Sequence, residues 1–187
     1  MNLFLLLVKS VHFMENILIF SDASINPKLK CGIGGYLLIG DSFFKDESPC
    51  FEKLKNQLIL KQFHNTSSTK LEVQTVLWSL EDYINCQNNN SKITIYSDSQ
   101  CVTGLNKRRV KLEKNDFCSK KNDKLLKNAF LYQQFYQYYD KLNFEVIKVK
   151  GHLPSKNKDT IHRIFSIVDR GVRKALKKWI KDMDSLN

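Results

Sequence analysis

Residues Ile93–Gln100 have the sequence Ile-Thr-Ile-Tyr-Ser-Asp-Ser-Gln, and this stretch decides the fold. Its apolar, partly β-branched first half predicts a strand that is covered on both faces. Asp98 and Ser99, which follow, are residue types that cap helix N-termini. Asp98 is therefore expected at the C-terminal end of a central strand, where open α/β sheets bind their ligands.

A second stretch near the N-terminus has the same organisation. The apolar residues 17–20 lead into Ser21-Asp22-Ala23-Ser24, and a turn signal follows at Asn26-Pro27. If the two strands are parallel neighbours, a spacing of about 4.8 Å brings Asp22 close to Asp98. Two carboxylates at that separation repel each other unless a cation lies between them, so the pattern predicts a metal site.

The segments between these two strands predict how they come together. Strands are expected at Gly32–Gly40 and Asn56–His64, on either side of a polar loop at Asp41–Lys55, and they form an antiparallel meander with the first strand. Caps at Thr66–Thr69 begin an amphipathic helix that ends near Asn85. A helix at this point allows the Ile93 strand to return parallel to the first one by a right-handed crossover.

The C-terminal half predicts one more strand and three helices. One of these helices is rich in aromatic residues, and we expect its rings to pack against the core rather than to stack on the bases of a nucleic acid. In chain order, the elements are a short helix through Val102 and Leu105, the aromatic helix Ala129–Asp140, a strand at Phe144–Val149 and a long helix at Thr160–Ile180.

The charge of the chain predicts a polyanionic partner. The 187 residues have a formal net charge of +11 and a pI near 9.4, which favours nucleic acid and, less specifically, anionic membranes. Residues 107–127 hold nine Lys or Arg and three Asp or Glu, so a net +6 is concentrated there. The five cysteines form no C-x-x-C pair, which argues against a disulfide framework or a zinc site and favours a reducing cytoplasm.

The length favours one domain, expected at residues 15–182, with a short tail at 183–187. Residues 1–14 open with an apolar run that is too short to span a bilayer, so we interpret them as an appendage outside the core. Met14 is an alternative start. We expect a monomer.

Four acidic residues and one histidine are candidates for chemistry, and each has a structural alternative. Asp22 fits a turn and Asp98 a helix cap. Glu72 fits a capping box with Thr69, and Asp169 fits an ion pair with Arg173. His152 follows a glycine and fits an ordinary loop residue, the interpretation we give to the remaining histidines His12, His64 and His162. The order of the five candidates along the predicted strands and helices favours a shared site.

In this order the chain resembles type 1 ribonuclease H, from about residue 15 to 178. The resemblance is carried by five motifs in sequence: Asp22-Ala23-Ser24 with Asn26-Pro27, a Gly-rich second strand, Thr69-Lys70-Leu71-Glu72, Ser97-Asp98-Ser99-Gln100 and Val149-Lys150-Gly151-His152, followed by Asp169-Arg170 on the last helix. The resemblance implies an α/β fold of the ribonuclease H type, a five-stranded mixed sheet with three antiparallel and two parallel strands, flanked by helices. It also implies hydrolysis of the RNA strand of RNA/DNA hybrids.

The resemblance further implies a site with two Mg²⁺ ions, which Mn²⁺ can replace, held by Asp22, Glu72, Asp98 and Asp169. In this hypothesis Asp22 bridges both ions, Glu72 and Asp98 hold the ion at the leaving group, and Asp169 holds the ion that activates water. His152 assists proton transfer or product release. The hybrid is the expected partner, with no membrane. Its expected contacts are Asn26, Ser68, Thr69 and Gln100 near the 2′-hydroxyls and Lys107, Arg108, Arg109 and Lys111 in a basic handle.

Three departures from the family pattern stand out: Ser68 and Thr69 where asparagines are common, Ala23 where glycine is usual, and a longer connection from His152 to Asp169. Two alternatives stay open. One is an integrase-like nuclease with this fold that acts on another nucleic acid, and the other is a hybrid-binding module without catalytic activity.

Overall fold

The computed structural model describes residues 16–45, 50–86, 91–150 and 154–185. Its centre is a five-stranded sheet with the strand order β3-β2-β1-β4-β5. The strands are β1 (Ile17–Asn26), β2 (Cys31–Gly40), β3 (Ile59–Phe63), β4 (Ile93–Ser97) and β5 (Glu145–Lys148). The pairs β1–β2 and β2–β3 are antiparallel, whereas β1–β4 and β4–β5 are parallel. The predicted mixed sheet is confirmed.

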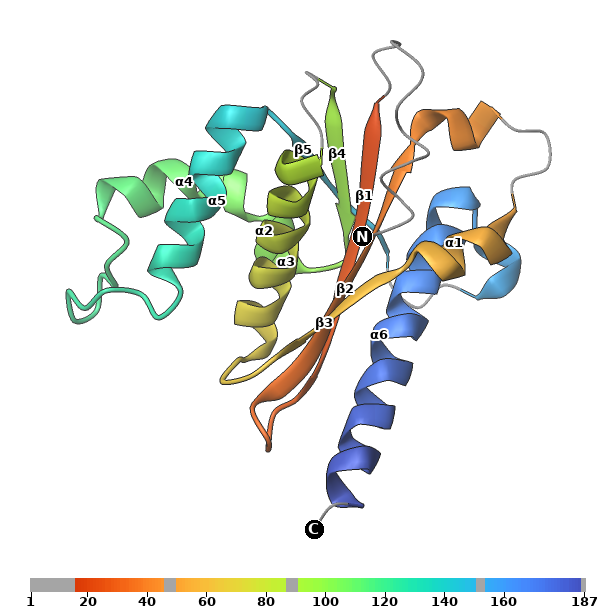
Figure 1. The fold of residues 1–187 in the computed structure, drawn as a ribbon. Helices are drawn as coiled ribbons and strands as arrows, with labels where there is room; N and C mark the ends of the chain where they lie inside the picture. The colour runs from red at the N-terminus through yellow and green to blue at the C-terminus, as the bar shows by residue number, and fades with distance from the viewer. Residues whose placement is uncertain (1–15, 46–49, 87–90, 151–153, 186–187) are drawn as a thin grey trace.

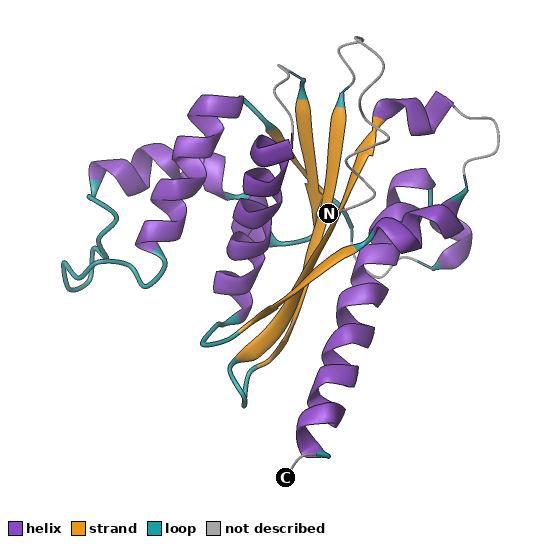
Figure 2. Cartoon of the chain, in the orientation of Figure 1, coloured by secondary structure: helices purple, strands orange, loops and turns teal. Residues whose placement is uncertain are grey.

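Helices cover both faces of the sheet (Figure 1, Figure 2). On one side α2 (Ser68–Cys86) lies against β1 and β2, and α5 (Ala129–Leu142) packs on α2. On the other side α6 (Thr160–Asp184) lies against the same two strands, and α1 (Phe51–Gln57) packs on α6.

Alternate side chains of β1 belong to two separate hydrophobic cores, one on each face of the sheet. Ile17 and Ile19 belong to the cluster under α2 and α5, whereas Phe20 belongs to the cluster under α6. Since successive side chains of a strand point to opposite faces, one apolar strand stabilises both layers. This central position makes β1 and its neighbour β4 a well-supported base for a site.

The predicted polar loop at Asp41–Lys55 is wrong. A 3₁₀ turn, η2 (Asp41–Lys45), and the short helix α1 occupy part of it, and β3 is correspondingly shorter than the predicted strand. Seven residues are too few for an independent helix. Leu54 of α1 is buried against the α6 core, and this tertiary packing stabilises the helix.

The predicted short helix through Val102 and Leu105 is two helices, α3 (Gln100–Thr103) and α4 (Leu105–Lys114), so the first part of the basic segment is helical. The predicted helix from Thr160 runs four residues further than expected, to Asp184. The leader at residues 1–14 lies outside the described residues, and its role stays a prediction.

The aromatic helix α5 packs into the core, as predicted. Phe135 is fully buried and its ring contacts Phe144 edge to face, with 5.2 Å between centroids. Phe130 of the same helix is 73% exposed.

We therefore expect Phe135→Ala to lower the free energy of unfolding by about 3–5 kcal/mol, because the substitution removes buried apolar area and leaves a cavity. The matched substitution Phe130→Ala is expected to change it by less than about 0.5 kcal/mol. Urea unfolding followed by circular dichroism measures both. Equal effects would show that α5 does not dock as described.

Candidate active site

Two aspartates meet where the parallel pair of strands ends. The β1–β4 ladder closes with Phe20 opposite Tyr96, and the same register places Asp22 across from Asp98, directly after β4. The prediction that Asp22 ends its strand is wrong, because β1 continues to Asn26 and Asp22 pairs with Gly35 of β2. The predicted proximity of the two carboxylates stands, since Asp98 is a close enough charge to perturb Asp22.

The electrostatic environment of Asp22 is unfavourable for a negative charge. Burial and then the charge of Asp98 are the largest causes that raise the pKa of Asp22, to about 8. The Ala23 backbone N–H opposes them, the charge of Asp169 adds a weaker increase, and Arg173 has the smallest opposing effect. Without a cation, the Asp22 carboxyl therefore keeps its proton to a higher pH than an ordinary aspartate does. Perturbed carboxyl groups of this kind are concentrated at functional sites.

Glu72 reaches the same edge of the sheet from the first turns of α2. Its two carboxylate oxygens accept hydrogen bonds from the hydroxyls of Ser68, at 2.9 Å, and Ser99, at 2.5 Å. Ser99 also N-caps α3 by accepting from the Val102 backbone N–H. The alternative of a capping box with Thr69 is wrong, because α2 begins at Ser68 and Thr69 lies inside the helix. The hydrogen bonds of Glu72 join α2 to the end of β4.

Asp169 lies on α6, near enough for its charge to act on Asp22. Its carboxylate forms the ion pair with Arg173 that sequence spacing suggested, at 2.5 Å. The ion pair does not exclude a shared site, because the charge of Asp169 also raises the pKa of Asp22. Elements from both layers and from the sheet therefore bring charged groups to one edge.

The candidate ligand atoms are carboxylate oxygens, which are the ligands that a hard divalent cation prefers. Their present positions, however, are not those of ligands around a bound ion. Within residues 16–45, 50–86, 91–150 and 154–185, no three carboxylate, imidazole or thiol side chains are grouped so as to hold one ion. Serine hydroxyls hold Glu72 and Arg173 holds Asp169, so both carboxylates would exchange partners to bind metal.

His64 follows β3 in a loop, as predicted, whereas the prediction that His162 is a loop residue is wrong, because His162 lies in the first turn of α6. The His64 ring packs edge to face on Trp179, and His162 bonds to Asp159, the N-cap residue of α6. Both have structural roles. His12 and the candidate His152 lie outside the described residues.

The four predicted 2′-hydroxyl contacts have different surroundings. Asn26 closes the β1–β2 turn by accepting from the backbone N–H groups of Lys28 and Leu29. Ser68 is bonded to Glu72, and Gln100 is exposed at the first position of α3. Thr69 is partly buried in the first turn of α2.

The basic handle is only partly available for binding. The Arg109 guanidinium forms a double hydrogen bond with Asp140 of α5 and a third bond with Glu113. Arg108 donates to the carbonyls of Cys101 and Gly104. Both arginines therefore fix α4 against its neighbours, whereas Lys107 and Lys111 are exposed.

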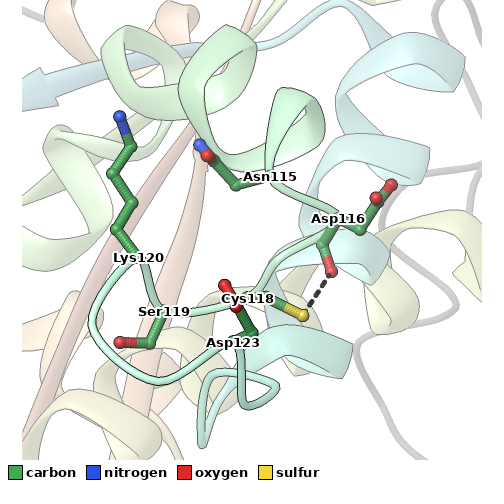
Figure 3. A pocket seen from close by; sticks show the side chains of 6 residues that line it. All are labelled: Asn115, Asp116, Cys118, Ser119, Lys120 and Asp123. Atoms are coloured by element: carbon green, nitrogen blue, oxygen red, sulfur yellow. Dashed lines mark hydrogen bonds between the residues drawn. The ribbon is translucent and has the colours of Figure 1, made fainter.

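The loop after α4 carries further charge. Figure 3 shows a pocket of about 290 Å³ in this loop, lined by Asn115, Asp116, Cys118, Ser119, Lys120 and Asp123. The Cys118 thiol donates to the Asp116 carbonyl at 3.5 Å, so the loop is closed by its own hydrogen bonds.

A groove that sequence reasoning missed adjoins Glu72. This α2 groove, of about 630 Å³, lies between the β1–β2 turn, the start of α2 and the start of α5. Its polar lining includes Lys30, Ser67, Ser68, Lys70, Lys127 and Asn128. The Asn128 side-chain oxygen is buried there without a partner among the described residues. The sequence feature that could have indicated this groove is Lys127, the last lysine of the basic segment at residues 107–127.

Three features define a ribonuclease H-like protein: the strand order, the flanking helices and the acidic edge. By the acidic edge we mean the carboxylates of Asp22, Asp98 and Asp169 and the adjoining Glu72. The family model for RNase H matches residues 14–162, and the chain belongs to this family. The match ends two residues after the start of α6, so Asp169 lies beyond it.

Solved structures with the same fold include two of foamy virus proteins. The foamy viral protease-reverse transcriptase in complex with dsDNA superimposes with a TM-score of 0.56 at 11% identity, over 86% of this chain and 95% of that one. The native prototype foamy virus protease-reverse transcriptase gives 0.61 at 14% identity, over 86% of this chain and 20% of that one. This chain thus spans about a fifth of the length of the second protein. No curated protein matches it in sequence. Among the described residues, no helix is long and apolar enough to cross a membrane.

Proposed function

We propose that this protein is an endoribonuclease that hydrolyses the RNA strand of RNA/DNA hybrids with the help of divalent metal ions. The observation that carries the proposal is that the charges of Asp98, directly after β4, and Asp169, on α6, both act on the buried carboxyl of Asp22 in β1. Glu72 is joined to that edge through Ser99. Membership of the RNase H family supports it, since the family generally uses divalent metal ions.

Each carboxylate has a distinct task in this proposal. When bound, two Mg²⁺ or Mn²⁺ ions would activate the attacking water and stabilise the leaving 3′-oxygen. Asp22 would contact both ions, Glu72 and Asp98 one of them, and Asp169 the other. The Ser68 and Ser99 hydroxyls orient Glu72, and Arg173 orients Asp169. His152 is proposed to move a proton or to assist product release.

Binding would rest on phosphate contacts, with recognition of RNA near the carboxylates. The α2 groove places Lys30, Lys70 and Lys127 around exposed Ser68, next to Glu72, and its cations suit a phosphate backbone. Asn26, Gln100, Ser68 and Thr69 are the side chains we propose near the 2′-hydroxyl, a group that both donates and accepts.

Cleavage assays on matched RNA/DNA, RNA/RNA and DNA/DNA duplexes test the proposal. We expect only the RNA strand of the hybrid to be cut in the presence of Mg²⁺ or Mn²⁺, and EDTA to abolish cutting. Cleavage of the DNA duplex would identify the integrase-like alternative. Tight hybrid binding without cleavage in either metal would identify the inactive binding module.

A further inference from the structure

The outward face of α6 carries a straight row of four basic side chains, Arg170, Lys174, Lys177 and Lys181, which we name the α6 row. Their spacing of four, three and four residues places them within about 60° of one another around a helix of 3.6 residues per turn. All four are exposed. The buried residues of α6, among them Val168 and Val172, lie on the opposite side and pack into the core.

The α6 row is electrostatically available, unlike much of the basic handle. None of its four side chains forms an ion pair with a residue that the structure describes. Arg109 of the handle is instead held by Asp140, and Arg173 on α6 by Asp169. The helix as a whole has seven Lys or Arg and three Asp, a net charge of +4.

The dimensions of the row suit the backbone of a nucleic acid. The eleven residue steps from Arg170 to Lys181, at a rise of about 1.5 Å each, give a row about 16 Å long. One strand of a duplex carries a phosphate for about every 3.4 Å of its axis, so four cations face about five phosphates. A membrane surface is the poorer match, because interfacial helices also insert an apolar face and that of α6 is buried in the core.

The position of the row indicates which part of the substrate it would meet. Arg170 directly follows the candidate ligand Asp169, so the row begins at the acidic edge and runs toward the C-terminus of α6. Figure 1 shows α6 on the opposite side of the sheet from α4 and α5. A duplex held over the acidic edge would therefore meet the handle on one flank and the α6 row on the other.

We propose that the α6 row is a second nucleic-acid contact, which binds the phosphate backbone of the duplex beyond the cleavage site on the flank away from the basic handle. The inference rests on the proposed function for the placement of the substrate. It does not rest on the family match, which ends before Arg170.

A triple variant, Lys174→Gln/Lys177→Gln/Lys181→Gln, tests the proposal. Its control is Lys45→Gln/Lys53→Gln/Lys92→Gln, which removes the same charge from exposed lysines elsewhere. Fluorescence anisotropy, in EDTA so that no strand is cut, compares hybrids of about one and about three helical turns over a salt series. Circular dichroism verifies that each variant is folded, and cleavage of the short hybrid in Mg²⁺ tests the proposed function separately.

We expect the α6 variant to bind the long hybrid about tenfold more weakly, with the slope of log K against log salt reduced by about 2 to 3. Binding to the short hybrid, and both affinities of the control, should stay within about twofold of wild type. The proposal for the α6 row would be overturned by an equal loss of affinity for the short and the long hybrid, by an equal loss in the control variant, or by no loss of affinity.

The outcomes separate this inference from the proposed function. If wild type cuts hybrids and the α6 variant binds the long hybrid as wild type does, the α6 row alone is refuted. If wild type cuts no hybrid while the length-dependent loss appears, the row stands as a nucleic-acid contact and the proposed function is refuted.

Discussion

Replacing Asp98 with asparagine is expected to lower the rate of hybrid hydrolysis by about a thousandfold or more while leaving hybrid affinity within about threefold. The substitution keeps the shape of the side chain but removes a charge from the acidic edge, where metal ions would supply several kcal/mol of transition-state stabilisation. Affinity depends on phosphate contacts elsewhere, so it is expected to survive. Single-turnover cleavage and fluorescence anisotropy measure the two quantities separately.

Asp116→Asn is the matched control, because it removes an exposed aspartate from the loop after α4. Its cleavage rate is expected to stay within about twofold of wild type. Near-normal hydrolysis by Asp98→Asn would remove the carboxylate mechanism, and a parallel loss of affinity would indicate a damaged fold.

Replacing Asp22 with asparagine is expected to abolish hydrolysis and, in the metal-free protein, to raise the melting temperature. The pKa of Asp22 is raised from 3.8 to about 8, so the folded state binds its proton more tightly than the unfolded state does. Between these two values the unfolded state ionises first, and wild-type stability therefore falls as pH rises. Asparagine does not ionise, so the variant does not lose stability in this way as the pH rises.

Thermal unfolding in EDTA at pH 4 and pH 8 tests this expectation. The stabilisation by Asp22→Asn should be small at pH 4 and larger at pH 8, at about 2–4 °C for each kcal/mol recovered in a domain of this size. Asp169→Asn is an informative companion, because it removes the ion pair with Arg173. A lower melting temperature for Asp22→Asn at pH 8 would show that Asp22 is satisfied by a partner rather than repelled by Asp98 and Asp169.

Local patterns in the sequence were sufficient to predict most of the elements. Patterns among neighbouring residues predict the apolar strands around Phe20 and Ile95 and the helices α2 and α6. Such local patterns are sufficient because a strand or helix forms from residues that are close in the sequence. The proximity of Asp22 and Asp98 also followed, because the parallel register of β1 and β4 places these two residues opposite each other. Where packing rather than pattern decided, prediction failed, as at α1, which depends on α6.

The sequence by itself thus determined most of the strands and helices, the helical faces and the parallel return that brings Asp22 near Asp98, because these depend on short-range periodicity and chain direction. Only the tertiary structure decided which polar partner each side chain takes. Glu72 meets Ser99, 27 residues away, and Arg109 meets Asp140, 31 residues away. The same folding leaves the four cations of the α6 row exposed. Hydrogen bonds and ion pairs of this kind depend on distances of a few ångströms between distant segments, and one-dimensional spacing does not encode those distances.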